Sequence, residues 1–258
     1  MASLPLVKRP LSSDVKKVLK DYIYALDASS NGKLPSEDAL AKQYGVSRIT
    51  IRRALDEMEQ EGLILRIHGR GTFVNQAALK MEVNILAGGE FRSILQNSGY
   101  QTSVRLLRAD SIRAPQNVAE DLHLPASESV LRIELMHYAN EHPAILSVDY
   151  ILERLLSEIP SSELWETTSF FGILRDYGGI VICRDRMRIQ SVLREDAQQL
   201  TPFSAQMENP ALLMTQGILY NQRNQPTVFG SALFDTRYLQ YSLMRSYESC
   251  CLRLDRAF

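Results

Sequence analysis

Residues 34–74 read LPSEDALAKQYGVSRITIRRALDEMEQEGLILRIHGRGTFV, and this stretch decides the fold of the N-terminal part of the chain. Ser36 precedes a short helical pattern that ends at Gly45, and Ser47 precedes a second helix that ends at Gly62. Two short helices joined by a turn of about three residues are typical of a helix-turn-helix, whose second helix enters the DNA major groove. The stretch therefore predicts a DNA-binding unit.

The second of these helices has two unlike faces. Its apolar side chains share one face at helical spacing, namely Ile51, Ala54, Leu55 and Met58. The opposite face carries Ile49, Arg52 and Arg53, and Arg48 lies in the first turn. We therefore expect one face to pack in a core and the other to present positive charge. A further amphipathic pattern over residues 14–26 predicts a helix that precedes this pair.

Two short apolar segments, residues 63–67 and 72–74, flank the tetrapeptide HGRG. Its two glycines permit a tight hairpin, which places His68 and Arg70 at the tip. A hairpin directly after a helix-turn-helix is a wing, so the N-terminal unit is predicted to be a winged helix-turn-helix.

The composition is that of an ordinary globular protein, with 258 residues, 45% hydrophobic and 23% charged. This length suits one small and one medium domain. No apolar run approaches the roughly 20 residues that span a bilayer, and the first 14 residues lack the apolar core of a secretory signal. We therefore expect a cytoplasmic protein without membrane contact. The cysteines lack zinc-type spacing, so reduced thiols are expected at Cys183, Cys250 and Cys251.

The net charge of −1 hides an asymmetry along the chain. Residues 1–75 hold 12 Lys and Arg against 9 Asp and Glu, and the remainder holds 17 against 21. An excess of three charges is too small to establish nucleic-acid binding, which needs cations gathered on one face beside phosphates. The positions of the arginines on the second helix therefore indicate DNA binding more strongly than the net charge does.

After the wing, the sequence pattern changes to β-like runs that alternate with helical stretches. We expect a winged helix-turn-helix over residues 1–75, a linker over 76–84 and an effector-binding and dimerisation domain over 85–258. Beyond the linker, β-like runs such as SVLRIELMHYA, AILSVDYIL and ALLMTQGILYN alternate with helical stretches such as GEFRSILQNSG and QNVAEDLHL. The fold class is therefore predicted to be α+β, with an antiparallel sheet in the second domain.

The stretch quoted above resembles the DNA-binding domain of the GntR family of bacterial regulators. The LPSE start, the GVSR turn, the T-x-R-x-A-L helix and the closing G-x-G-T-F-V appear in order and at the right separations. The resemblance implies that the recognition helix approaches DNA with Ser47, Arg48, Thr50 and Arg52, and that His68 and Gly69 lie at the wing tip in the minor groove. Arginine suits base readout, because a bidentate pair with guanine is worth about 1–3 kcal/mol of discrimination.

Several nearby residues have more than one interpretation. Arg53 either contacts DNA or forms solvated helix pairs with acidic residues three and four positions on. His68 either contacts DNA or is an ordinary turn residue, and Glu37 is expected to be a capping or structural carboxylate. Many family members carry Arg or Lys where this chain has Asp38, so a DNA contact of the relatives is expected to be missing here.

The rest of the chain resembles the HutC subfamily, whose UTRA effector domain is an α+β fold related to chorismate lyase that binds small metabolites. The resemblance rests on short stretches spread over about 170 residues: FRSILQNSGY, NVAEDLHLPASESVLRI, HPAILSVDYI, TTSFFGILRDYGG, NQRNQPTVFG and ALFDTRY. It implies a homodimer that binds a short palindrome in double-stranded operator DNA, and a repressor that a small-molecule effector releases.

The effector is expected not to be a sugar phosphate. Members that bind such sugars carry two arginines where Leu135 and His137 align, and acidic residues often stand at the positions of Ser147 and Val228. The effector contacts expected from the alignment are His137, Asp149, Tyr150, Ser169 and Phe171. Two of them have structural alternatives, His137 as a satisfied core histidine and Phe171 as plain core.

Two other classes of function are alternatives, an enzyme and a regulator with a metal-assisted effector domain. The likeness to chorismate lyase raises an enzyme of that fold, although an effector fold need not retain catalysis. Some relatives hold pyridoxal phosphate on a lysine, but after the wing the sole lysine is Lys80, so we expect neither an enzyme nor a cofactor. Other subfamilies have an all-helical, metal-assisted effector domain. The second half has three histidines, and two of them fall in a predicted strand and its turn, so no metal site is expected.

Overall fold

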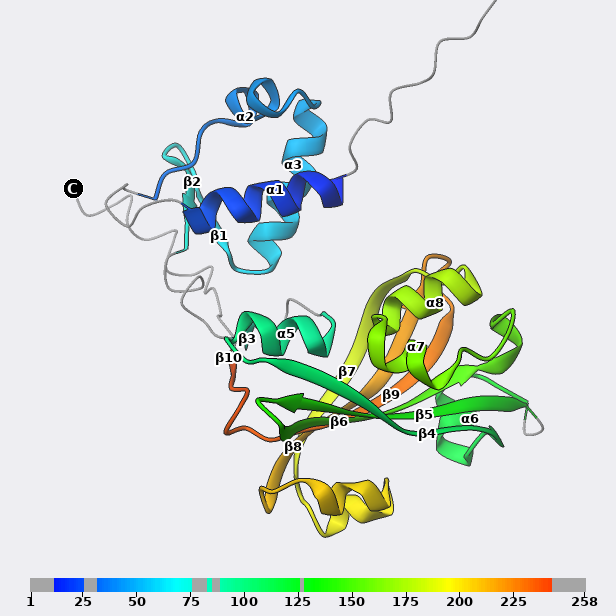
Figure 1. Cartoon of the computed structure of the whole chain (residues 1–258). Coiled ribbons are helices and arrows are strands. Elements are labelled where there is room, and N and C mark those ends of the chain that lie inside the picture. Colours follow the sequence, from blue (N-terminus) through cyan, green and yellow to red (C-terminus); the bar gives the residue numbers. More distant parts are fainter. Residues whose placement is uncertain (1–11, 26–31, 76–82, 85–88, 126–127, 243–258) are drawn as a thin grey trace, which may run out of the picture. The chain divides into compact units, whose positions relative to one another are not determined.

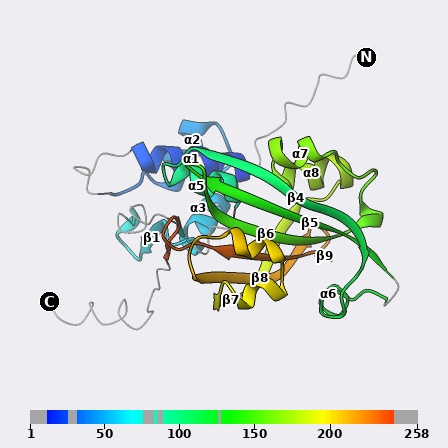
Figure 2. The same cartoon turned by 60° about the horizontal axis from the view of Figure 1, so that its bottom comes forward.

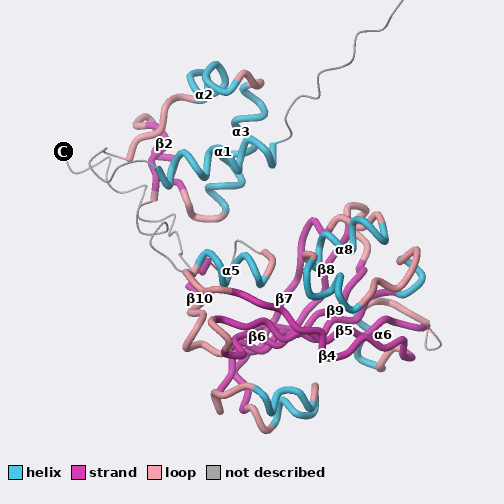
Figure 3. The backbone as a smooth tube through the Cα atoms, in the orientation of Figure 1, coloured by secondary structure: helices cyan, strands magenta, loops and turns pink. Residues whose placement is uncertain are grey.

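The computed structural model describes residues 12–25, 32–75, 83–84, 89–125 and 128–242. It divides into two compact units, one formed by residues 1–88 with 241–258 and the other by residues 89–240. The first unit is mainly helical and the second is built on strands (Figure 3). The expected linker falls largely on residues 76–82, and these residues, with Cys250 and Cys251, lie outside the described part of the chain.

The first unit has the predicted order of three helices followed by a hairpin. Its elements are α1 (Ser12–Ala25), α2 (Glu37–Tyr44), α3 (Arg48–Gln60), β1 (Ile64–Ile67) and β2 (Gly71–Val74), with a short parallel pair of β3 (Val83–Asn84) and β10 (Tyr241–Ser242). The hydrophobic core joins the buried faces of the three helices to the hairpin; its members include Leu19, Ile23, Leu40, Ile51, Leu55, Met58 and Ile64.

Local capping explains where these helices begin and end. The Ser36 hydroxyl accepts a hydrogen bond from the Ala39 amide at the start of α2, and Gly45 ends that helix with a φ of 65°. The Ser47 hydroxyl accepts from the Thr50 amide at 3.1 Å and so starts α3. The positive φ of Gly45 favours glycine, because a side chain would be strained there. The predicted helix-turn-helix is confirmed.

The second unit contains one six-stranded sheet. Its strands are β4 (Thr102–Arg113), β5 (Ser129–Ala139), β6 (His142–Leu152), β7 (Ile182–Leu193), β8 (Ala211–Asn221) and β9 (Pro226–Phe234). They lie side by side in the order β4-β5-β6-β9-β8-β7, and every pair is antiparallel (Figure 2). The predicted α+β fold is therefore confirmed, and the all-helical alternative is wrong.

Short helices cover both faces of this sheet (Figure 1). One face, called here the α8 face, is covered by α5 (Phe91–Asn97), α7 (Ser162–Thr167) and α8 (Phe170–Gly178). The opposite face packs against α6 (Gln116–Asp121) and the 3₁₀ segments η2 (Asp196–Gln199) and η3 (Pro202–Gln206), while η1 (Glu153–Leu155) follows β6. No helix in the described part of the chain is long and apolar enough to cross a membrane.

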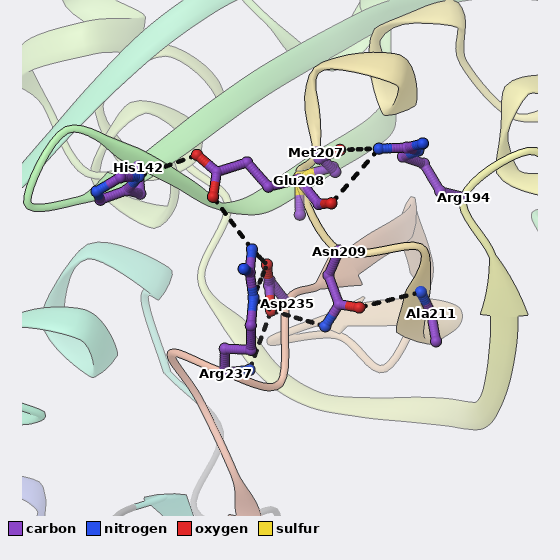
Figure 4. A network of polar contacts seen from close by, with 8 residues as sticks. All are labelled: His142, Arg194, Met207, Glu208, Asn209, Ala211, Asp235 and Arg237. Carbon is purple, nitrogen blue, oxygen red and sulfur yellow. Dashed lines mark hydrogen bonds and ion pairs between the residues drawn. The ribbon is translucent and has the colours of Figure 1, made fainter.

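A polar network holds one end of the sheet together (Figure 4). Arg237 contacts both Asp235 and Glu208, at 2.6 and 3.2 Å, and the other oxygen of Glu208 lies 2.9 Å from Nδ1 of His142. Asn209 donates to Asp235 as well. Burial alone would raise the pKa of Asp235, but the hydrogen bonds from Arg237 and Asn209 outweigh it and hold that pKa below its usual value. The network joins the β5–β6 turn to the segments before β8 and after β9.

Candidate functional sites

The exposed face of α3 is the first candidate site. The side chains of Arg48 and Arg52 are each 56% exposed, and Ile49 is 65% exposed. Arg53 is also exposed, and no hydrogen bond or ion pair to a described residue involves its side chain. The structure thus gathers all three predicted arginines on one solvent-facing surface, together with the capping pair Ser47 and Thr50, whose hydroxyl oxygens lie 2.8 Å apart.

Acidic side chains from the first turn of α2 contact two of these arginines. Oε2 of Glu37 lies 3.1 Å from Nε of Arg48 and 3.5 Å from Nε of Arg52. Oδ1 of Asp38 lies 3.4 Å from Arg48, and Arg66 on β1 also reaches Glu37, at 3.9 Å. Glu37 therefore orients the arginines of α3, a role that only the packing of α2 against α3 reveals.

The wing is the hairpin of β1 and β2, whose residues pair from Ile64 opposite Val74 to Ile67 opposite Gly71. The turn between the strands exposes His68, Gly69 and Arg70. Gly69 has a φ of 72°, and no heavy atom lies within 4 Å of the position where its Cβ would stand. The tip is therefore open to solvent, with two basic side chains beside a bare backbone.

The second candidate site lies on the α8 face of the sheet. His137 of β5 and Asp149 of β6 both point to this face, because the register pairs His137 with Ile145 and alternate residues of β6 share one side. Ser147 of β6 and Thr215 of β8 occupy the same face. Phe171, in the first turn of α8, belongs to the apolar cluster that covers it.

Glu90 links the helices to this polar cluster. Its two carboxylate oxygens accept hydrogen bonds from the backbone amides of Phe170 and Phe171, at 3.3 and 2.7 Å, so Glu90 occupies the N-terminus of α8. The Ser169 hydroxyl caps the same helix by accepting from the Gly172 amide at 2.9 Å. Sequence reasoning missed Glu90, because the 80 residues between it and α8 hide the contact.

Several polar atoms in the cluster have no hydrogen-bond partner among the described residues. Both ring nitrogens of His137 and the hydroxyl of Thr215 are buried and have no partner there. The two residues are only 7% and 6% exposed, so bulk water does not replace the missing partners. Sequence reasoning also missed Thr215; its signal was a polar residue in the otherwise apolar alternation of β8. Unpaired buried polar groups are costly, so such atoms point to a ligand that satisfies them.

Burial shifts the pKa values of His137 and Asp149 in opposite directions. It lowers the pKa of His137 to about 3, and the positive charge of Arg92 adds to this effect. It raises the pKa of Asp149 to about 7, against the hydrogen bond from Ser147 and with the help of the Glu90 charge. At neutral pH the site therefore holds an uncharged imidazole and a carboxyl group close to its midpoint.

The structure does not bring Tyr150 into this cluster. Tyr150 is the neighbour of Asp149 in β6, so its side chain points to the opposite face. There its ring packs against the ring of Phe229 within an apolar cluster. Arg132 lies over its ring at 5.6 Å. Leu135, one of the two positions of the arginine pair in relatives, is buried in the apolar core of the α8 face.

Two family models match the chain. The model described as bacterial regulatory proteins, gntR family, matches residues 11–74, and the UTRA domain model matches residues 97–240. They cover the first unit and most of the second.

The similar curated proteins and solved structures include transcriptional regulators. The chain is 28% identical over 247 residues to the HTH-type transcriptional repressor NagR of Bacillus subtilis, covering 96% of this chain and 92% of NagR. It is 33% identical over 138 residues to the histidine utilization repressor of Klebsiella aerogenes, covering 52% and 55%. For several curated relatives the chain spans little more than half of their length. The structure of the possible regulator YydK from Bacillus subtilis shares the fold, with a TM-score of 0.68, 19% identity and coverage of 91% of this chain and 99% of YydK.

Proposed function

Because this chain belongs to the gntR family of bacterial regulatory proteins and carries a UTRA domain, we propose that it is a sequence-specific transcriptional repressor whose operator binding is controlled by a small metabolite. The relatives NagR and the histidine utilization repressor are themselves named as repressors. The proposal includes a cytoplasmic location, where the operator is, and no catalytic step, since the matched relatives are regulators.

The exposed face of α3 carries the DNA-binding part of the proposal. Arg48, Arg52 and Arg53 stand on one side of a helix of 13 residues, about 20 Å long, which fits the major groove. Arginine donors of this kind read guanine edges, while Ser47 and Thr50 suit phosphate oxygens. The wing residues His68, Gly69 and Arg70 complete the surface with contacts to the minor groove.

Control by the metabolite requires a ligand whose affinity differs between the DNA-competent and incompetent arrangements of the protein. We place its binding site at His137, Asp149 and Phe171, with Ser169 at the start of α8 and with Tyr150 left outside. The proposed limits are residues 1–75 for the DNA-binding domain, 76–84 for the linker and 85–258 for the effector and dimerisation domain. A homodimer would present two recognition helices to a short palindrome.

The experiment that tests this function is a mobility-shift titration of the full chain with fragments of its own promoter region, at two salt concentrations. Arg48→Ala and Arg52→Ala are expected to weaken specific binding at least tenfold, since each removes a base-reading donor. Lys17→Ala is the matched control, because Lys17 is an exposed cation on α1 and its loss changes charge alone. Specific binding that survives both arginine substitutions, or its absence from promoter and genome-wide selected DNA alike, would overturn the proposal.

A further inference from the structure

We infer that the cluster around Asp149 binds a ligand through an ammonium group, and that it rejects ligands whose only charge is a phosphate or carboxylate. This inference rests on the proposed function, because it names the chemical class of the metabolite that the effector domain takes.

The two carboxylates of the cluster lack an ion-pair partner. Among the described residues, no Lys or Arg forms an ion pair with Asp149 or with Glu90, and Ser147 is a hydrogen-bond partner of the Asp149 carboxylate. The charge of Arg92 acts on His137, but its guanidinium donates to the backbone carbonyls of Glu166 and Thr167 and not to either carboxylate. A partly buried carboxylate without a cation is destabilising, and an ammonium group on the ligand would offset that effect.

The anion site that this face would otherwise offer is already filled. The N-terminus of a helix binds phosphate or carboxylate through its free amides. At α8 the amides of Phe170 and Phe171 both donate to Glu90, and the Gly172 amide donates to Ser169. A phosphate on the ligand would have to displace Glu90 and would then lie near the carboxylate of Asp149. The carboxylate of Glu90 thus already occupies the position at the N-terminus of α8 that the phosphate of a sugar phosphate would take.

A glycine makes room for the Asp149 carboxylate on this face. Gly230 of β9 stands opposite Asp149 in the sheet, and a Cβ at Gly230 would lie 2.8 Å from Oδ1 of Asp149. A side chain at position 230 would therefore collide with the carboxylate. Thr215 and His137 lie on the same face with unpartnered polar atoms, and a neutral imidazole offers one donor and one acceptor. They suit hydroxyl or amine groups elsewhere on the ligand.

Aromatic side chains supply the apolar contacts. The Phe91 ring meets the His137 ring at 5.4 Å and the Phe234 ring at 5.5 Å, both edge-on. Phe171 enters the same face from α8. Ring faces attract cations, so an ammonium group is compatible with these aromatic neighbours. The geometry points to an amine carried on a compact apolar or ring-shaped body.

The test uses the full chain and matched probes in calorimetric and thermal-shift titrations at pH 8. The amines are 2-phenylethylamine and 2-amino-1-phenylethanol, and the probes matched to them are 2-phenylethanol, 3-phenylpropanoate and phenyl phosphate. We expect the amines to bind at least tenfold more tightly than the alcohol and both anions. We expect Asp149→Asn to abolish this preference, and Asp196→Asn, an exposed carboxylate on η2, to keep it.

Two further measurements separate the possible failures. Circular dichroism and unfolding curves establish that Asp149→Asn is folded, and Thr215→Val should weaken the amino alcohol at least threefold while leaving 2-phenylethylamine unchanged. Equal affinity for amine and alcohol, or an amine preference that survives Asp149→Asn, overturns the inference. The same samples are tested for operator binding. Specific DNA binding without an amine preference would overturn this inference alone. An amine preference without specific DNA binding would overturn the repressor proposal alone.

Discussion

Oε2 of Glu37 lies 3.1 Å from Nε of Arg48, so an acidic residue of α2 holds an arginine on the exposed face of α3, which we propose reads DNA bases. The same oxygen lies 3.5 Å from Nε of Arg52. Both arginines are more than half exposed, and without Glu37 their long side chains would sample many rotamers. We therefore expect the contact to affect DNA specificity, through the direction of the arginines, more than stability.

Glu37→Gln is expected to reduce the discrimination between operator and scrambled DNA by about tenfold. The substitution releases Arg48 and Arg52 and removes one negative charge, so binding to scrambled DNA should rise slightly while operator binding falls. Fluorescence anisotropy with two labelled duplexes measures both affinities. An unchanged ratio would show that Glu37 has no part in orienting the arginines.

Asp38→Lys is expected to strengthen binding to all DNA. Asp38 stands 3.4 Å from Arg48 and is largely exposed. Replacing it removes a repulsion from phosphate and adds one contact, so the slope of log affinity against log salt should steepen by about one unit. Glu158→Lys, in the other unit, serves as the control for net charge. Equal slopes for the two variants would contradict the prediction.

Glu134→Ala is expected to destabilise the protein by about 3 kcal/mol, because it leaves the charges of two partly buried arginines uncompensated. Glu134 is fully buried; it contacts Arg108 at 3.1 Å and accepts a hydrogen bond from Thr201. Nε of Arg132 also lies 2.8 Å from Glu134, though the two are not aligned as a hydrogen bond. Urea unfolding measures the loss, with the exposed Glu158→Ala as control. A loss below about 1 kcal/mol would mean that solvent reaches the cluster.

Asp149→Asn is expected to stabilise the ligand-free protein at pH 8 and to have little effect at pH 4. Burial raises the folded-state pKa of Asp149 to about 7, so its contribution to stability is fully present below the unfolded value near 4 and is lost as pH rises through 7. The gain should be about 2 kcal/mol, less than the whole shift implies because the residue is partly exposed. Urea midpoints from pH 4 to 8 test this, and a constant difference would contradict it.

His137→Phe is expected to change how the stability of the protein depends on pH below about 6.5. The folded-state pKa of His137 is lowered to about 3, so its contribution is present above the unfolded value near 6.5 and is lost as pH falls toward 3. Phenylalanine keeps the edge-on contact with Phe91 and removes two unpartnered ring nitrogens. The decline in stability between pH 6.5 and 4 should therefore become shallower, and a variant as acid-sensitive as the wild type would refute the assignment.

Much of the DNA-binding unit could be predicted because its signals are local. Ser36, Gly45 and Ser47 set the helix ends through contacts at most four residues away, and glycine at 69 permits the wing turn. The spacing of Ile51, Ala54, Leu55 and Met58 placed the core face, and the exposed arginines followed from it. Such interactions are complete within one or two helical turns, so neighbouring residues determine them.

The effector face was harder to predict from the chain alone. Alternation along β6 means that adjacent residues cannot face the same side, which separates Asp149 from Tyr150. The pattern could have shown this separation, but which of the two faces holds the site depends on the helices that cover it. Likewise, Leu135 and His137 share a face, yet one lies in the apolar core and the other meets Phe91.

The order of the elements, the capped helices, the wing and the positions of the arginines follow from the residues alone. The folded chain was needed to show that Glu37 holds Arg48, that Glu90 fills the N-terminus of α8, and that Asp149 lacks a cation among the described residues. The two groups of features differ in the separation of the interacting residues along the chain. Capping and periodicity act between near neighbours, whereas burial and charge pairing depend on segments up to 80 residues apart that meet when the sheet and its helices pack.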